Sequence, residues 1–435
     1  MATVPPRLAP EDRLFILSKV YQSISLYFAH WEASPLRKEE LDAEYVKLLQ
    51  ETAQLEDPMR FTLQLMRFLA RLNNGQTAFF PSPEHAPLPL GLSAVPIGGE
   101  WVVTASRHAG ISIGDAILTI EDRSLDDWFA ALRQYYAAGH PEAAKRRLLD
   151  MLAFAVPAVL RIRLETPDGE VRELHVDRTE GEPDPHRLPS LRPSIRWADD
   201  ERTATLLRIP SFADPACEEE ALALVQSHKH APALIVDIRG SEGGLTPEKL
   251  VRALMDRPYR FWAESTPVTI GIHALQAAKG LDTAYYDAGM LLRPASRKPD
   301  PAAYDGALVL LTDRGTGSAA EEFALPFRDN GRALLIGEPT RGSAGQSFTY
   351  RFKNGMSVRI GTSRVYLPDG SPLEGVGIVP DRLVSPSRLS LCEAHDPALD
   401  EALAWLRFER PDAIRQGAAE AASAADGPPD PVSLS

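Results

Sequence analysis

A serine stands at a predicted strand-to-helix turn, in the segment 315–322 (GTGSAAEE). An apolar run at 307–311 precedes the turn and is typical of a buried strand, while a helical pattern follows it. Such a turn places the hydroxyl of Ser318 at the N-terminus of the helix, where free backbone N–H groups, above all that of Ala319, can stabilise an oxyanion. The segment therefore indicates a nucleophile for acyl transfer.

Two other interpretations of this segment remain open. Ser318 with Glu321 three residues later matches a capping box, which requires no chemistry, and the octapeptide taken alone favours it. The spacing Gly315-x-Gly317-x-x-Ala320, with Glu338 23 residues after Gly315, resembles a dinucleotide-binding fingerprint. Three residues separate the strand from the first glycine, whereas a phosphate-binding turn is tight, so the nucleotide site is the less favoured of the two.

A second candidate turn is 237–244 (DIRGSEGG), directly after the apolar run 233–236. Paired glycines after a buried strand allow a backbone N–H to approach a ligand closely. The alternative is an ordinary turn between a strand and a helix.

The composition of the whole chain limits the kind of fold that can position these turns. The chain has 435 residues, of which 44% are hydrophobic and 25% charged, as in soluble globular proteins. Two cysteines, Cys217 and Cys392, exclude a disulfide framework and a thiolate metal site. With 47 basic and 60 acidic side chains the net charge is −13, which argues against nucleic acid as a partner and offers no basic patch for anionic lipid.

No membrane span is expected, because the longest apolar run, 151–160, has ten residues and includes Pro157. Charged residues at 11–13 occupy the place where a signal peptide would need an apolar core. We therefore expect a cytoplasmic protein.

The pattern along the chain predicts a multidomain α/β fold. We expect an N-terminal helical segment at 1–82, with a helix starting at Asp57-Pro58, and a PDZ-like β module at 88–179. The phrase 110–118 (GISIGDAIL) carries the PDZ likeness. A proline-rich linker at 180–194 leads to a crossover-type αβ core at 195–410 that ends in a helix, and a disordered tail follows at 411–435.

Within these parts, short β-like runs predict individual strands. In the β module they cover 101–104, 116–120, 160–164 and 171–176, with helical stretches at 125–136 and 141–152 between the second and third runs. In the core they cover 203–207, 233–236, 307–311 and 333–336, and a β-rich part follows at 348–366. The near-continuous apolar character of the core runs suits strands that helices cover on both faces.

Several ordered phrases together resemble the tail-specific, or carboxyl-terminal processing, serine proteases, a family that includes the tricorn core protease and the interphotoreceptor retinoid-binding proteins. The turn 237–244 resembles the family's D-L-R-G-N-G-G-G, and 317–321 resembles its nucleophile segment. The run 329–342 resembles the phrase that follows, and 373–381 (LEGVGIVPD) resembles the closing E-G-x-G-V-x-P-D. The resemblance extends over roughly 41–406.

This resemblance implies a serine peptidase that acts on peptide or protein substrates without a metal or organic cofactor, and it leaves a homo-oligomer open. It assigns the nucleophile to Ser318. It assigns the oxyanion hole to the N–H of Ala319 together with that of Gly243 or Gly244. If the protein is active, the PDZ-like module would present a substrate tail.

The general base departs from the family pattern. One branch of the family uses a lysine 25 residues after the serine, where this chain has Ser343. The other uses a histidine from an L-N-D-G-H-T phrase, supported by a glutamate in the closing motif. Here the phrase reads LNNGQT at 72–77, so that Gln76 stands at the histidine position and Glu374 at the glutamate position. Glutamine cannot accept a proton productively, and a serine hydroxyl is a weak nucleophile without a base.

Three hypotheses follow from the missing base. The enzyme recruits another base, for which His85 is the nearest downstream histidine and His108 the next. Glu374 acts as the base itself, which requires a pKa raised by burial. Or the protein is a catalytically inactive peptide- or ligand-binding homologue that keeps the cleft.

Overall fold

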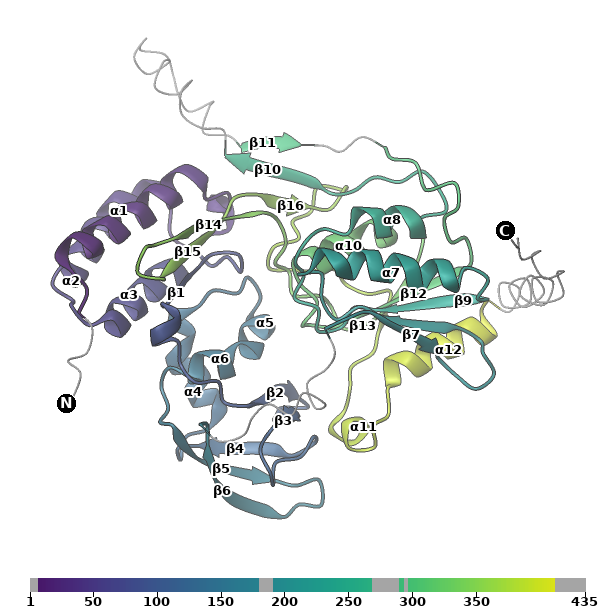
Figure 1. Ribbon diagram of the computed structural model, residues 1–435, viewed down its shortest axis with the longest axis horizontal. Coiled ribbons are helices and arrows are strands. Elements are labelled where there is room, and N and C mark those ends of the chain that lie inside the picture. Colours follow the sequence, from purple (N-terminus) through teal and green to yellow (C-terminus); the bar gives the residue numbers. More distant parts are fainter. Residues whose placement is uncertain (1–6, 180–190, 268–288, 293–295, 411–435) are drawn as a thin grey trace, which may run out of the picture.

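The computed structural model describes residues 7–179, 191–267, 289–292 and 296–410 (Figure 1). Most of the predicted linker at 180–194, and the whole predicted tail at 411–435, lie outside the described residues. None of the described helices is both long enough and apolar enough to cross a bilayer.

The N-terminal part contains three helices, α1 (Pro10–Tyr27), α2 (Leu41–Thr52) and α3 (Pro58–Ala70). The predicted start of α3 is confirmed, since Pro58 is its first residue and the Asp57 side chain accepts a hydrogen bond from the Arg60 N–H. Short 3₁₀ helices η1 (Trp31–Ala33), η2 (Lys38–Glu40) and η3 (Pro83–His85) lie in the connections.

These helices share an apolar core with a three-stranded sheet in the order β1-β15-β14. Strand β1 (Ala78–Phe80) pairs antiparallel with β15 (Ser357–Gly361), which in turn pairs with β14 (Ser347–Arg351). Two segments about 280 residues apart in the sequence therefore lie side by side, as Figure 1 shows beneath α1.

The predicted β module is a five-stranded antiparallel sheet in the order β2-β3-β4-β5-β6. Its strands are β2 (Leu92–Ile97), β3 (Glu100–Ser106), β4 (Ala116–Ile120), β5 (Val159–Glu165) and β6 (Val171–Asp177). All four predicted runs are strands, and β2 is an addition. The inserted helices are α4 (Leu125–Leu132), η4 (Arg133–Tyr135), α5 (Pro141–Arg146) and α6 (Leu148–Leu152). The likeness to a PDZ domain stays a prediction.

The αβ core is built on a six-stranded sheet in the order β17-β13-β12-β9-β8-β7, in which every neighbouring pair is parallel except β7–β8. The strands are β7 (Ser194–Trp197), β8 (Thr205–Arg208), β9 (Ala233–Asp237), β12 (Ala307–Thr312), β13 (Leu334–Gly337) and β17 (Arg382–Leu383). Every residue of β9 and β12 is buried, because helices cover both faces of the sheet.

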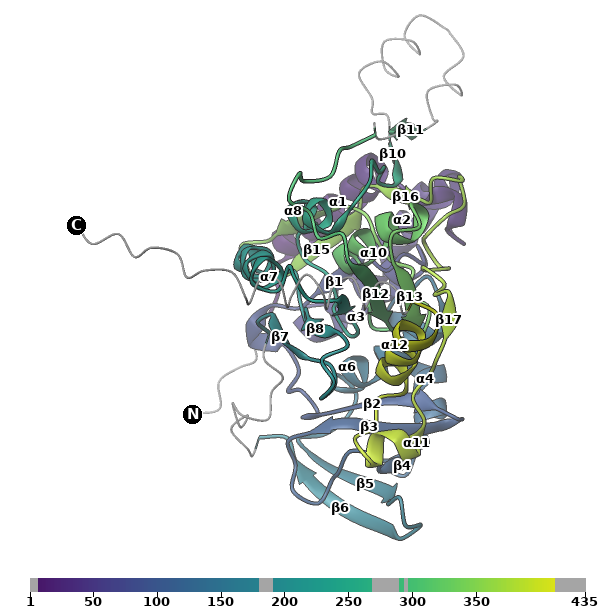
Figure 2. The ribbon, with the colours of Figure 1, turned by 90° about the vertical axis from the view of Figure 1, so that its right-hand side faces the viewer.

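One face packs against α7 (Pro215–Ser227), α8 (Glu248–Leu254) and α10 (Ala319–Asp329), and the other against α12 (Pro397–Phe408). Figure 2 shows α7 and α12 on opposite sides of this sheet. The remaining elements are α11 (Arg388–Cys392) and a small sheet of β10 (Ala263–Pro267), β11 (Gly289–Leu292) and β16 (Arg364–Tyr366). The predicted α/β class, with N-terminal helices and a parallel core, is confirmed.

The parallel pairing of β9 with β12 brings their carboxyl ends to one edge of the sheet. The two candidate turns leave the sheet there and are bonded to each other. The N–H of Gly317 donates to the Ser241 carbonyl at 2.9 Å, and Thr316 Oγ1 donates to the Ile238 carbonyl at 3.1 Å. The fold thus joins two turns that are far apart in the sequence.

Candidate active site

Ser318 has an unusual backbone conformation at the N-terminus of α10. Its φ is 54° and its ψ −127°, a region that costs a residue with a side chain on the order of 1–3 kcal/mol. Its N–H donates to the Ser343 carbonyl at 2.9 Å, and the side chain is half-buried. The Ser318 side chain accepts no capping hydrogen bond from the helix, so the capping-box interpretation is wrong.

Glu321 is bonded elsewhere, which explains why no capping box forms. Its buried carboxylate accepts hydrogen bonds from the Gly342 N–H at 2.7 Å, the Ser343 N–H at 2.9 Å and Thr340 Oγ1. Burial raises the pKa of Glu321, and these hydrogen bonds oppose that rise. Glu321 therefore fixes the loop 340–343 against the turn that carries Ser318.

Gly243 lies directly against the serine. A Cβ atom on Gly243 would stand 2.5 Å from the Ala319 nitrogen and 2.7 Å from Ser318 Cβ, so only glycine fits. Within the described residues, the N–H groups of Gly243 and Ala319 have no hydrogen-bond acceptor. Gly244 instead packs its Cα against the backbone of Phe212, where a Cβ would meet a carbonyl carbon at 2.2 Å. The structure thus brings Ser318, Ala319 and Gly243 together.

The two positions where the family carries a base are in contact with each other. Gln76 is only 8% exposed, and its Nε2 donates to the Ser343 carbonyl at 3.1 Å and to Ser343 Oγ at 3.4 Å. The same carbonyl accepts the Ser318 N–H. Gly75 leaves room for this contact, because a Cβ there would lie 2.3 Å from Ser343 Oγ. An amide and a hydroxyl therefore stand beside the serine where a base is expected.

Glu374 lies behind this pair. Its Oε1 accepts hydrogen bonds from Asn74 Nδ2 at 2.9 Å and from the Gly75 N–H at 3.1 Å, while its Oε2 is buried and has no hydrogen-bond partner. Burial raises the pKa of Glu374 to about 8, against the lowering effect of the Gly75 N–H. The carboxyl group is therefore mainly protonated at neutral pH.

A cleft of about 670 Å³ runs past the serine. It is lined by Ser318, by both glycines 243 and 244, and by Gln76 and Ser343, so most of the predicted site residues meet in one place. Ala319 and Glu374 lie behind its wall. The cleft is assembled from the N-terminal part, from the segment around α5 and α6, and from the αβ core.

The two candidate histidines lie away from this cleft. His85 Nδ1 is bonded to Ser82 Oγ at 2.7 Å, and His108 Nε2 to the Leu90 carbonyl at 2.7 Å. No histidine or lysine is among the described residues that line the cleft. In the described part of the chain no cluster of three or more histidine, cysteine or acidic side chains could hold a metal ion.

Sequence reasoning missed the charged lining of the cleft, which consists of Arg147, Arg341, Arg359, Asp150 and Glu242. Arg341 Nη2 donates to Glu242 Oε1 at 3.0 Å, and Arg359 Nε donates to the Gln76 carbonyl at 3.0 Å. Arg341 and Glu242 occupy variable positions inside two of the family phrases, where a motif gives no signal. Arg147 and Asp150 are three residues apart in a helical stretch, which is only a weak signal.

Comparisons with known proteins bear on the family resemblance and on the fold. Residues 203–384 match the model of Peptidase family S41. The chain is 27% identical over 216 residues to a carboxyl-terminal-processing protease of Synechocystis sp., a match to 49% of this chain and 46% of that protein. It is 24% identical over 386 residues to the chloroplastic carboxyl-terminal-processing peptidase 2 of Arabidopsis thaliana, covering 85% and 66% of the two chains. The matches span less than two thirds of either relative's length.

Among solved structures, the crystal structure of mature CPAF superposes with a TM-score of 0.69. The alignment covers 94% of this chain and 98% of that one at 18% sequence identity, so the likeness shows the fold alone. With the family match it confirms the resemblance predicted from the sequence: residues 203–384 match peptidase family S41, and the chain is similar to carboxyl-terminal-processing serine proteases.

Proposed function

We propose that the protein is a serine-type peptidase-like hydrolase that cleaves peptide substrates by acyl transfer through Ser318. The observation that carries this proposal is the backbone of Ser318, held at a positive φ at a helix N-terminus and packed against Gly243 within an open cleft. Strained conformations of this kind persist where the surrounding structure fixes them, and they gather at active sites.

In the proposed reaction, Ser318 Oγ forms a bond to the carbonyl carbon of the substrate. The carbonyl oxygen gains negative charge, and the N–H groups of Ala319 and Gly243 would donate hydrogen bonds to it. Each donor of this type contributes about 10²–10³-fold to the rate in serine proteases. The carbon–nitrogen bond of the substrate then breaks, and the amine leaves with the proton that Ser318 Oγ gave up. Water hydrolyses the acyl-enzyme, which releases the carboxylic acid and returns a proton to Ser318 Oγ.

The proton of Ser318 passes to the leaving amine through an atypical acceptor, either another side chain or a water molecule in the cleft. Gln76 cannot take it, and Glu374 lies behind the cleft wall and is mainly protonated at neutral pH. Of the described residues that line the cleft, only Asp150 and Glu242 carry carboxylates, and Glu242 is paired with Arg341. A positioned general base raises the reaction rate by about 10²–10⁴-fold, so we expect slow turnover without one.

A second candidate function, a catalytically inactive peptide-binding homologue, is favoured by the Gln76–Ser343 hydrogen bond. That contact fills both base positions with groups that bind each other and do not titrate near neutral pH. A protein of this kind would hold a peptide in the cleft without cleaving it.

Labelling with a fluorophosphonate probe tests the proposal. Between pH 6 and 9 we expect the protein to be labelled at Ser318, and the Ser318→Ala variant to remain unlabelled. Because the probe carries a good leaving group, it reports the nucleophile and the oxyanion donors even where peptide turnover is slow. Absence of labelling across this range, in a protein that still binds peptides, would favour the inactive homologue.

A further inference from the structure

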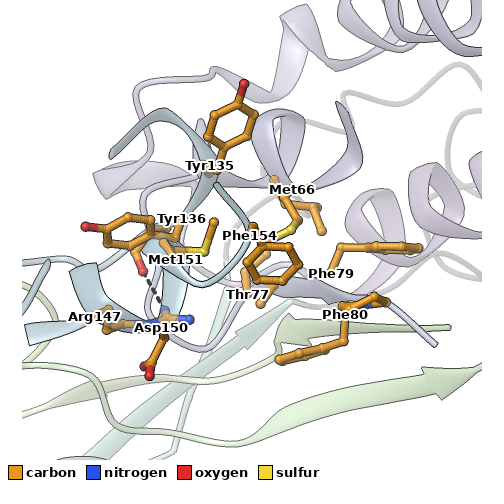
Figure 3. A pocket seen from close by; sticks show the side chains of 15 residues that line it. Met66, Thr77, Phe79, Phe80, Tyr135, Tyr136, Arg147, Asp150, Met151 and Phe154 are labelled. Atoms are coloured by element: carbon orange, nitrogen blue, oxygen red, sulfur yellow. Dashed lines mark hydrogen bonds between the residues drawn. The ribbon is translucent and has the colours of Figure 1, made fainter. Parts of the chain in front are cut away.

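A second, smaller cavity of about 230 Å³ lies beside the cleft (Figure 3). Its walls are mainly apolar, include five aromatic rings, and come from four places in the sequence, the first of which is the end of α3 with Met66, Leu69 and Ala70. Phe79 and Phe80 belong to β1, Tyr135 and Tyr136 stand at the end of η4, and Met151 and Phe154 come from α6 and the residues after it. We call this cavity the aromatic pocket.

The aromatic pocket adjoins the cleft that contains Ser318. Phe80, Ala137, Arg147 and Asp150 line both cavities, so these four residues form the boundary between them. Figure 3 shows Arg147 and Asp150 beside each other at one side of the pocket, and the rings of Phe79, Phe80 and Phe154 at the other. The charged groups thus lie at the boundary with the cleft, together with Phe80, whereas Phe79 and Phe154 line the aromatic pocket alone.

The interior of the pocket offers few unsatisfied polar groups. Phe79 is 1% exposed, Met151 3% and Tyr136 6%. The Tyr136 hydroxyl donates to the Ala144 carbonyl at 3.0 Å, and Thr77 Oγ1 donates to Asn74 Oδ1 at 2.8 Å. Away from Arg147, Asp150 and the Tyr135 hydroxyl, a charged or strongly polar group inside would lose its hydration and gain few hydrogen bonds, which is unfavourable.

The size of the pocket suits an aromatic ring. An apolar cavity of about 150 Å³ in a protein interior is known to stay dry and to bind benzene. The aromatic pocket is larger and shares four lining residues with the cleft, so a phenyl ring on a chain that lies in the cleft could reach it if the side chain of Arg147, which donates to the Ala137 carbonyl at 3.1 Å, moves aside. Its aromatic walls would make edge and face contacts with such a ring.

We propose that the aromatic pocket is the specificity pocket of the cleft and takes a large apolar side chain, preferably an aromatic one, of the bound peptide. This inference rests on the proposed function, because it requires a peptide in the cleft. It adds the class of substrate residue that the cleft selects.

The charges at the opening argue against a basic side chain in the pocket. Asp150 could attract an ammonium group, but Arg147 stands next to it and repels the same group. A lysine would also have to leave its ammonium inside the apolar interior or fold it back. We therefore expect the order phenylalanine, leucine, alanine, with lysine no better than alanine.

The test measures binding of four peptides, acetyl-Ala-Ala-X-Ala-Ala-amide with X as Phe, Leu, Ala or Lys, to the Ser318→Ala protein by calorimetry. We expect the Phe peptide to bind at least 10-fold more tightly than the Ala peptide, since one methylene in an apolar pocket is worth about 10-fold or more. Ala70→Leu, which places a larger side chain at the pocket wall, should abolish the preference. Ala130→Leu, at an exposed position of α4 outside the pocket, should leave it unchanged.

Equal binding of the four peptides, or a Phe preference that survives Ala70→Leu, would overturn the proposal. If no peptide binds, the proposed function of the cleft has failed, and toluene then tests the pocket alone. Thermal stabilisation by toluene that Ala70→Leu removes, and Ala130→Leu does not, supports an aromatic-binding pocket. No stabilisation by toluene overturns it.

Discussion

The Gln76→His variant tests whether position 76 is the place of the missing general base. Gln76 lies beside Ser343, whose carbonyl is bonded to the Ser318 N–H, and residues 74 and 75 are bonded to Glu374 Oε1. A histidine here would have the serine turn on one side and a buried carboxyl group with a free Oε2 on the other. These are the two neighbours that a serine–histidine–acid triad needs.

The size of the effect follows from two opposing contributions. A positioned general base raises kcat/KM by about 10²–10⁴-fold. The supporting carboxylate must be ionised to stabilise the imidazolium, and a pKa of about 8 leaves about one tenth of Glu374 ionised at pH 7. We therefore expect a gain of about 10–10³-fold at pH 7, and a larger gain at pH 8.5, where Glu374 is mostly ionised.

The assay compares hydrolysis of a chromogenic peptide ester by the natural protein, by Gln76→His and by Gln76→His combined with Ser318→Ala. Only the single variant should gain activity, and the gain should rise with pH between 7 and 8.5. If Gln76→His melts at the temperature of the natural protein, is still labelled by a fluorophosphonate, and yet shows no gain, then the assignment of the base position is refuted.

Two further predictions concern the oxyanion donors and the buried acid. Gly243→Ala should slow fluorophosphonate labelling by at least about 10²-fold, because its Cβ would stand 2.5 Å from the Ala319 nitrogen. Gly240→Ala is the matched control, since Gly240 also has a positive φ but its Cβ would have open space around it. This variant should be labelled at the normal rate. A comparable loss in both variants would show that backbone strain alone, not the space beside Ala319, is responsible. The folded protein keeps the Glu374 carboxyl group protonated up to about pH 8, whereas the unfolded chain releases this proton near pH 4.5. The free energy of unfolding of the protein should therefore fall by a few kcal/mol as the pH rises from about 4.5 to 8. Because glutamine stays neutral, the Glu374→Gln variant should lose less stability across this pH range, as measured by urea unfolding. If the two proteins gave parallel curves of stability against pH, the raised pKa of Glu374 would be contradicted.

The sequence was sufficient for the elements whose local pattern is strong. The core runs at 233–236 and 307–311 are strands because their continuous apolar residues can only be buried between two helical layers. The start of α3 at Pro58 followed from its cap. The family resemblance assigned the glycine turn at 237–244 and the serine turn at 315–318 to one site, and the parallel pairing of β9 with β12 explains why they meet at one edge of the sheet.

The local pattern of the sequence could not predict the contacts between distant segments. Nothing in 78–80 or 357–361 indicates that these strands pair, because strands of three and five residues carry too little periodicity to identify a partner. Arg147 and Arg359 reach the cleft only through that pairing and through the break between α5 and α6. The capping box failed because Glu321 finds stronger partners in the loop 340–343, which no local rule includes.

The pairing of β1 with β15 also bears on how the protein is made. Gln76 leaves the ribosome about 280 residues before Gly361, which completes the strand that pairs with β1. Loop closure over so long a stretch is slow relative to local folding. The nascent chain therefore carries Ser318 before the opposite wall of its cleft is complete, so any hydrolytic capacity has to wait until residues 352–361 join the core of the N-terminal helices.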